Sequence, residues 1–96
     1  MLSATRARAN RLANADHANL VRASRAAHEQ VVALRRLAAA GELERVDADL
    51  REIADLRLEH PSLSLRELGL KCRPPLAKAS VHRRLQALVR LAEDVF

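Results

Sequence analysis

The stretch SLRELGLKCRPPLAKASVHRRLQALV, residues 64–89, predicts two helices that are joined by a tight turn. Ser64 and Glu67 have the spacing of a capping box, in which the serine caps the helix start and the glutamate reaches back to the serine amide. We therefore expect a short helix over 65–71. Pro74-Pro75 then predicts an extended turn, because proline disfavours a helical residue before it.

The last helix is expected over 77–94. Its apolar residues recur at spacings of four and three, which is the pattern of one buried helix face. These residues are Val81, Leu85, Leu88, Ala92 and Val95. A short helix, a turn and a longer amphipathic helix together are typical of a helix-turn-helix unit.

Two further helices are expected before this unit. One covers about 47–59 and ends at His60-Pro61. The other covers about 17–40, with Asp16 as its cap and Gly41 as its left-handed C-cap. Its apolar stripe is Leu20, Ser24, Ala27, Val31, Leu34 and Ala38. Residues 1–15 are interpreted as a basic arm or linker that carries Arg6, Arg8 and Arg11.

The composition favours an all-α fold in one small domain. The 96 residues include one aromatic side chain, two glycines and three prolines, whereas strands favour aromatic residues and their turns favour glycine. Good helix formers such as Ala, Leu, Arg and Glu dominate instead. The predicted architecture is a long N-terminal helix followed by a three-helix helix-turn-helix unit over 47–94, so that residues 16–96 form one helical domain.

Charge is distributed unevenly and indicates a polyanionic partner. The net charge is +5, while residues 42–60 hold seven acids against three arginines. From Lys71 to Leu91 the chain has six basic residues and no acid. A charge run is commonly a solvated helix face, but the missing acids and the position just after a turn favour a DNA-binding surface.

The last helix of a helix-turn-helix enters the major groove with its N-terminal residues toward the base edges. Once the buried positions are set aside, the candidates for base contacts are Lys78, Ala79, Ser80, His82, Arg83 and Gln86. Arginine and lysine suit guanine, glutamine suits adenine, and serine suits either. The candidates for phosphate contacts are Arg66, Lys71, Arg73, Arg84 and Arg90.

Other classes of function fit less well. Single-strand binders stack bases on aromatic side chains, which the basic region lacks. We expect no enzymatic activity, no cofactor, no small-molecule ligand and no metal, because the four histidines are scattered and no phosphate loop or nucleophile motif is present. Cys72 is interpreted as a reduced structural thiol. No apolar run is long enough to span a bilayer, so we expect a cytoplasmic, nucleoid-associated protein.

Two alternatives remain open at this level. The acidic helix over 47–59 and the alanine-rich first helix would suit a protein-interaction module that docks a sigma factor or another transcription partner, with DNA contacts secondary. Non-specific binding to the nucleoid is the second alternative. A steep salt dependence of affinity would favour phosphate contacts, and competition with random duplex would separate specific from non-specific binding.

Three blocks of the sequence resemble the C-terminal domain of the WhiA family, a group of bacterial regulators of sporulation and cell division. The blocks keep their order and spacing over nearly the whole chain. They are ANRLAN with ANL at residues 9–14 and 18–20, LRLEHPSLSLRELG at residues 56–69, and PPLAKASV followed by RL at residues 74–81 and 84–85.

The resemblance implies a transcription regulator whose helix-turn-helix binds promoter DNA. In the family a domain related to LAGLIDADG endonucleases, without nuclease function, precedes this one, so the chain looks like a C-terminal fragment. The resemblance also implies a sporulation sigma factor and a WhiB-type iron–sulfur protein as partners. Ala77 departs from the family's usual Ser or Thr cap, and His82-Arg83 departs from the common Asn-His, which predicts a different DNA site.

Overall fold

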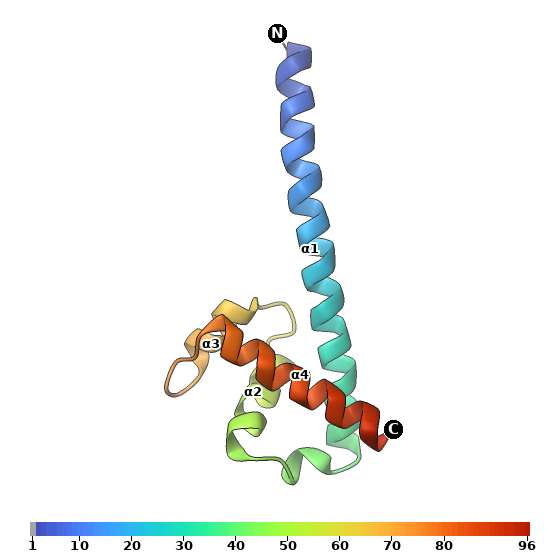
Figure 1. The fold of residues 1–96 in the computed structure, drawn as a ribbon, viewed down its shortest axis with the longest axis vertical. Coiled ribbons are helices and arrows are strands. Elements are labelled where there is room, and N and C mark those ends of the chain that lie inside the picture. Colours follow the sequence, from blue (N-terminus) through green and yellow to red (C-terminus); the bar gives the residue numbers. More distant parts are fainter. Residues whose placement is uncertain (1) are drawn as a thin grey trace.

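The computed structural model describes the backbone of residues 2–96 and the side chains of residues 21–96. Its elements are α1 (Leu2–Ala39), the short 3-10 helix η1 (Glu42–Glu44), α2 (Ala48–Glu59), α3 (Leu65–Lys71) and α4 (Lys78–Val95). The described part of the chain contains no strand, and the fold is all-α as the composition predicts. Figure 1 shows α1 as a long rod, with the other helices gathered around its C-terminal end.

The helix starts differ from the sequence expectation mainly at α1. Its backbone is helical from Leu2, so Asp16 lies inside the helix and does not begin it. α3 covers the expected residues, and α2 and α4 each begin one residue later than expected. The side chains of Arg6, Arg8 and Arg11 lie outside the described residues, so the basic arm or linker over residues 1–15 stays a prediction.

α1 ends at a glycine that adopts the left-handed conformation. Gly41 has φ 74°, and its amide donates to the carbonyl oxygen of Ala38 at 3.1 Å. No atom lies within 4 Å of the position that a Cβ would occupy there. Backbone conformation alone therefore favours glycine at this position, because an L side chain is strained at positive φ.

The core lies where α1, α2, α3 and α4 meet, but α1 contributes a different stripe from the predicted one. Val31 and Leu34 are buried as expected, whereas Ser24 and Ala38 are exposed, which corrects the sequence interpretation. Leu37 is fully buried in place of Ala38. A buried leucine removes more apolar area from water than an alanine, so the helix turns its leucine inward.

The turn between α2 and α3 is organised by a buried arginine. Arg57 is 2% exposed, and its Nη1 donates to the carbonyl oxygens of His60, Pro61 and Leu63 at 3.4, 3.3 and 2.6 Å. Burial lowers the pKa of the guanidinium. A buried charge needs hydrogen bonds to compensate its lost hydration, and these three carbonyl groups supply them at Nη1, while the buried Nε has no partner among the described residues. Arg57 thereby fixes the direction in which the chain enters α3.

The turn between α3 and α4 depends on a close backbone approach. The carbonyl oxygen of Gly69 accepts from the amides of Cys72 at 3.2 Å and Leu76 at 2.9 Å. A Cβ at Gly69 would collide with the carbonyl oxygen of Leu76. Glycine at this position therefore lets residues 72–76 fold back against α3, which brings α4 into place beside it.

Candidate nucleic-acid interface

The buried side of α4 determines which of its residues face solvent. Val81, Leu85 and Leu88 are fully buried and Ala92 is 6% exposed, as the apolar spacing predicts. Val95 is 41% exposed, so the predicted stripe ends one turn earlier. α4 packs against α1, α2 and α3 through this side, and its opposite side is left open along the first turns (Figure 1).

The predicted base-contacting residues share this open surface. Lys78, Ala79, His82, Arg83 and Gln86 are exposed. Ser80 is half-buried, and its Oγ accepts a hydrogen bond from Arg83 Nη2 at 3.3 Å. The structure therefore brings all six candidates onto the N-terminal half of one helix, with Arg83 held along the helix surface by its neighbour one turn earlier.

The N-terminus of α4 has no side-chain cap. Ala77 takes the N-cap position with φ −70° and ψ 154°, and its side chain offers no acceptor to the first turn. No acidic residue lies in that turn either. The first amides of the helix therefore keep their partial positive charge, which adds to the charge of Lys78.

The predicted phosphate-contacting residues divide into two groups. Arg66 at the start of α3, Lys71 at its end, Arg73 in the turn and Arg90 on α4 are exposed. Arg84 is half-buried, and its Nη2 lies 3.9 Å from Oδ2 of Asp49 on α2. Four of the five cations are thus available on the surface, while the fifth already has a carboxylate partner within the domain.

Glu52 is a residue that the sequence reasoning missed. From the sequence, the acids of the second helix had no predicted structural role, but Glu52 is half-buried and its Oε2 accepts from the backbone amide of Arg73 at 3.2 Å. It therefore holds the α3–α4 turn against α2. No sequence signal distinguishes it from the neighbouring acids, because its partner is a backbone amide 21 residues away.

Cys72 lies in the turn between α3 and α4, near Glu52 of α2. It is 2% exposed, and its Sγ lies 3.5 Å from the carbonyl oxygen of Leu68. Burial raises the pKa of the thiol, and the nearby Glu52 carboxylate raises it further, while Arg84 acts in the opposite sense. The thiol is thus a buried group of the core whose pKa lies above that of an ordinary cysteine.

The described residues form neither a metal cluster nor a membrane-spanning helix. No group of three His, Cys, Asp or Glu side chains in the range 21–96 is placed to hold a metal ion. Over the same part of the chain, each helix is either too short or too polar to cross a lipid bilayer.

A family model described as the WhiA C-terminal HTH domain matches residues 9–92. The chain belongs to this family. The match includes all of α2 and α3 and most of α4, so the helices described above are those of a WhiA helix-turn-helix domain.

Individual WhiA proteins show the same relationship. A "Probable cell division protein WhiA" of Symbiobacterium thermophilum is 50% identical over 86 residues, which cover 90% of this chain and 27% of that protein. The protein of the same name in Lactococcus lactis subsp. cremoris is 41% identical over 87 residues, which cover 91% of this chain and 28% of that protein. The chain thus spans little more than a quarter of the length of these relatives.

The solved structure of full-length DUF199/WhiA from "Thermatoga maritima" has the same arrangement of helices. It superposes with a TM-score of 0.80 and 33% sequence identity, over 88% of this chain and 29% of that one. WhiA proteins therefore share this domain as one part of a longer chain.

Proposed function

We propose that this WhiA-type domain binds double-stranded promoter DNA sequence-specifically and serves a transcription regulator rather than an enzyme. α4 would lie in the major groove, with Lys78, Ala79, Ser80, His82, Arg83 and Gln86 toward the bases. The observation that carries the proposal is the open, acid-free surface on the N-terminal half of α4. Such a helix fits a major groove about 12 Å wide.

The surroundings of α4 support contacts with the DNA backbone. Arg66, Lys71 and Arg73 lie on α3 and the turn that precedes α4, and all three are exposed. Cations at the edges of a recognition helix neutralise phosphates and set the register of the protein on the duplex. Arg90 would extend this contribution toward the C-terminal half of α4.

A comparison of two arginine variants tests the proposal. Arg83→Ala removes a candidate base contact, and Arg45→Ala removes a cation whose side chain is 80% exposed beside η1, outside α3 and α4. Both substitutions are on the surface and leave the fold intact. Binding is measured by fluorescence anisotropy on a duplex selected from a random pool and on an unrelated duplex of the same length.

The proposal predicts different losses for the two variants. Arg83→Ala weakens binding to the selected duplex by about 1–3 kcal/mol and affects the unrelated duplex much less. Arg45→Ala leaves both affinities nearly unchanged. Equal losses of Arg83→Ala on both duplexes would make Arg83 a phosphate contact, and equal affinities of the unsubstituted chain for the two duplexes would indicate non-specific nucleoid binding.

The partners that the family resemblance implies are separate proposals. Contacts with a sigma factor or a WhiB-type protein would add to DNA binding and would not replace it. They are tested by adding each purified partner to the free chain and to its complex with duplex. A ternary complex supports the partner contact beside DNA binding, whereas a chain that binds the partner but not the duplex would be a protein-interaction module.

A further inference from the structure

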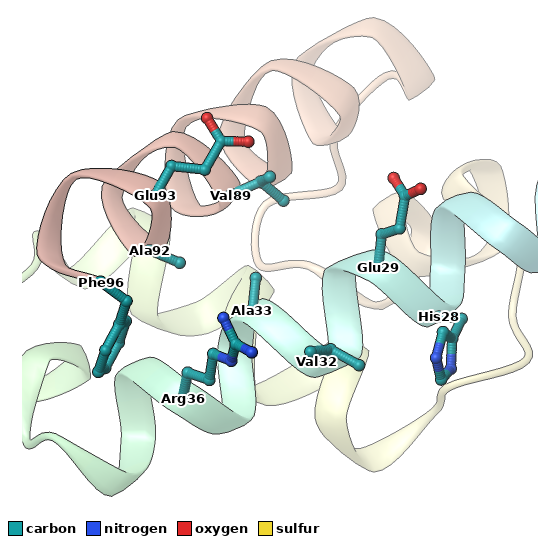
Figure 2. Close-up of a pocket in the computed structure, with 9 residues that line it drawn as sticks. All are labelled: His28, Glu29, Val32, Ala33, Arg36, Val89, Ala92, Glu93 and Phe96. Atoms are coloured by element: carbon teal, nitrogen blue, oxygen red, sulfur yellow. The ribbon is translucent and has the colours of Figure 1, made fainter.

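A groove lies between α1 and the C-terminal half of α4, away from the candidate DNA surface. It has a volume of about 690 Å³ (Figure 2). Much of its apolar lining comes from Val32 on α1, Val89 on α4 and Phe96 directly after α4. At about 1.5 Å per residue, its centre on α4 lies roughly 15 Å along the helix from His82.

Exposed apolar side chains concentrate at this end of the domain. Among the described residues, Val32, Val95 and Phe96 are 37%, 41% and 62% exposed, and Leu70 on α3 is the remaining large apolar side chain with such exposure. Exposed apolar groups that cluster beside a groove are typical of an interaction site, whereas scattered ones are ordinary surface. Leu70 is a scattered surface residue in this sense.

The groove is also acidic where the rest of α4 is basic. Glu29 on α1 and Glu93 on α4 are exposed, and their side chains extend in the same direction on either side of Val89 (Figure 2). The ion pairs found within residues 21–96 include neither carboxylate. Both carboxylates are therefore open to a cation from outside. Arg36 also lines the groove, with its guanidinium extending toward Ala33 (Figure 2), so the groove carries two carboxylates and one arginine.

We propose that this groove binds an amphipathic helix of a partner protein, with its apolar side chains on Val32, Val89 and Phe96 and a lysine or arginine beside Glu29 and Glu93. A helix that presents apolar residues at i, i+3, i+4 and i+7 fits a groove between two helices. The two carboxylates select a basic edge and repel a nucleic-acid phosphate.

A second copy of the chain does not supply such a helix from its described elements. α4 combines basic residues with an apolar stripe, but Val81, Leu85 and Leu88 of that stripe are fully buried in the core. α2 and α3 likewise bury Ile53 and Leu68. The proposed occupant is therefore a helix of another protein, and a second copy that docks through α1 is an outcome of the test below. The proposal does not depend on DNA binding, because it involves different residues from those on the N-terminal half of α4.

Two synthetic helical peptides test the proposal with the full chain labelled with nitrogen-15. Both carry the same leucine stripe, and one has lysines along its edge where the other has glutamates. The lysine peptide is expected to bind about three- to tenfold more tightly, since each exposed ion pair contributes a small attraction that the glutamates reverse. Its amide shifts are expected around Val32, Val89 and Phe96.

Charge-reversed variants provide the matched control. Glu29→Lys combined with Glu93→Lys should reverse the preference between the two peptides. Glu44→Lys combined with Glu59→Lys changes two other exposed carboxylates and should leave the preference as it was.

Several results would overturn the proposal. Equal binding of the two peptides, no binding of either, or shifts confined to the Lys78–Gln86 surface would each do so. Concentration-dependent shifts of the groove amides without peptide, together with a dimer in sedimentation, would assign the groove to a second copy instead.

Discussion

Asp49 on α2 and Arg84 on α4 form an ion pair across the domain, with 3.9 Å between Oδ2 and Nη2. The Asp49 side chain is 79% exposed, whereas that of Arg84 is 27% exposed. Arg84 is one of the candidate phosphate contacts. To bind a phosphate, its guanidinium would have to break the ion pair with Asp49 or contact both anions at once. Asp49 of α2 thus partly neutralises the positive charge of Arg84 beside the candidate DNA surface.

Asp49→Asn is expected to strengthen DNA binding. The substitution removes the carboxylate that competes with a phosphate for Arg84, and affinity should rise about two- to fivefold at low salt. Arg84→Gln should reduce the slope of log affinity against log salt by about 0.9, which corresponds to one phosphate contact. Anisotropy titrations at several salt concentrations measure both effects. An unchanged slope for Arg84→Gln would show that Arg84 serves only to hold α2 against α4.

Gly69→Ala is expected to destabilise the domain by about 1–3 kcal/mol, the usual cost of overpacking. The added methyl group collides with the backbone carbonyl of Leu76, which no rotamer change relieves. Gly41→Ala is the matched control, since it meets no atom and costs about 1 kcal/mol through its positive φ alone. Urea unfolding followed by circular dichroism measures both. A loss for Gly69→Ala no larger than that for Gly41→Ala would contradict the close approach.

Arg57→Met is expected to lower the free energy of unfolding by about 2–3 kcal/mol. The variant keeps the apolar stem but leaves the carbonyls of His60, Pro61 and Leu63 without their donor. Arg66→Met changes an exposed arginine of α3 and should alter stability by less than about 0.5 kcal/mol. Thermal or urea unfolding compares the pair. Equal stabilities would mean that water satisfies these carbonyls as well as Arg57 does.

Cys72 is expected to react with iodoacetamide only at a higher pH than an ordinary cysteine. Burial and, second, the Glu52 carboxylate raise the pKa of its thiol. A raised pKa in the folded state contributes stability below the pKa of the unfolded thiol, and that contribution is lost as pH rises through the folded pKa.

The midpoint of the alkylation rate against pH measures this shift, while poor access to the thiol lowers only the maximum rate. Glu52→Gln keeps an acceptor for the Arg73 amide and removes the charge, so it should move the midpoint to lower pH. A midpoint unaffected by Glu52→Gln would leave burial as the only cause.

The apolar spacing and the capping box are sufficient to define much of the helix-turn-helix. Ser64 Oγ accepts from the Glu67 amide at 3.1 Å, and the Glu67 carboxylate accepts from the Ser64 amide at 3.4 Å, as their spacing predicts. Val81, Leu85 and Leu88 are buried because residues on one helix face recur every three or four positions. These features are local, so local sequence was sufficient to predict them.

Features that depend on distant partners were not predictable in this way. The predicted stripe of α1 is rich in alanine and serine, and this weak pattern did not identify Leu37 rather than Ala38 as the buried residue. Leu37 is buried because α1 packs against α2 and α4. The role of Arg57 depends on carbonyl groups that a particular turn brings together.

What the sequence by itself determined is the set of amphipathic helices, the cap of α3 and the acid-free surface on the N-terminal half of α4, because each depends on residues within a few positions of one another. Only the tertiary structure decided that Glu52 holds the α3–α4 turn, that Asp49 pairs with Arg84, and that α1 and α4 leave an acidic groove between them. These relationships join residues from different helices, and the distances between such residues are set by how the helices pack.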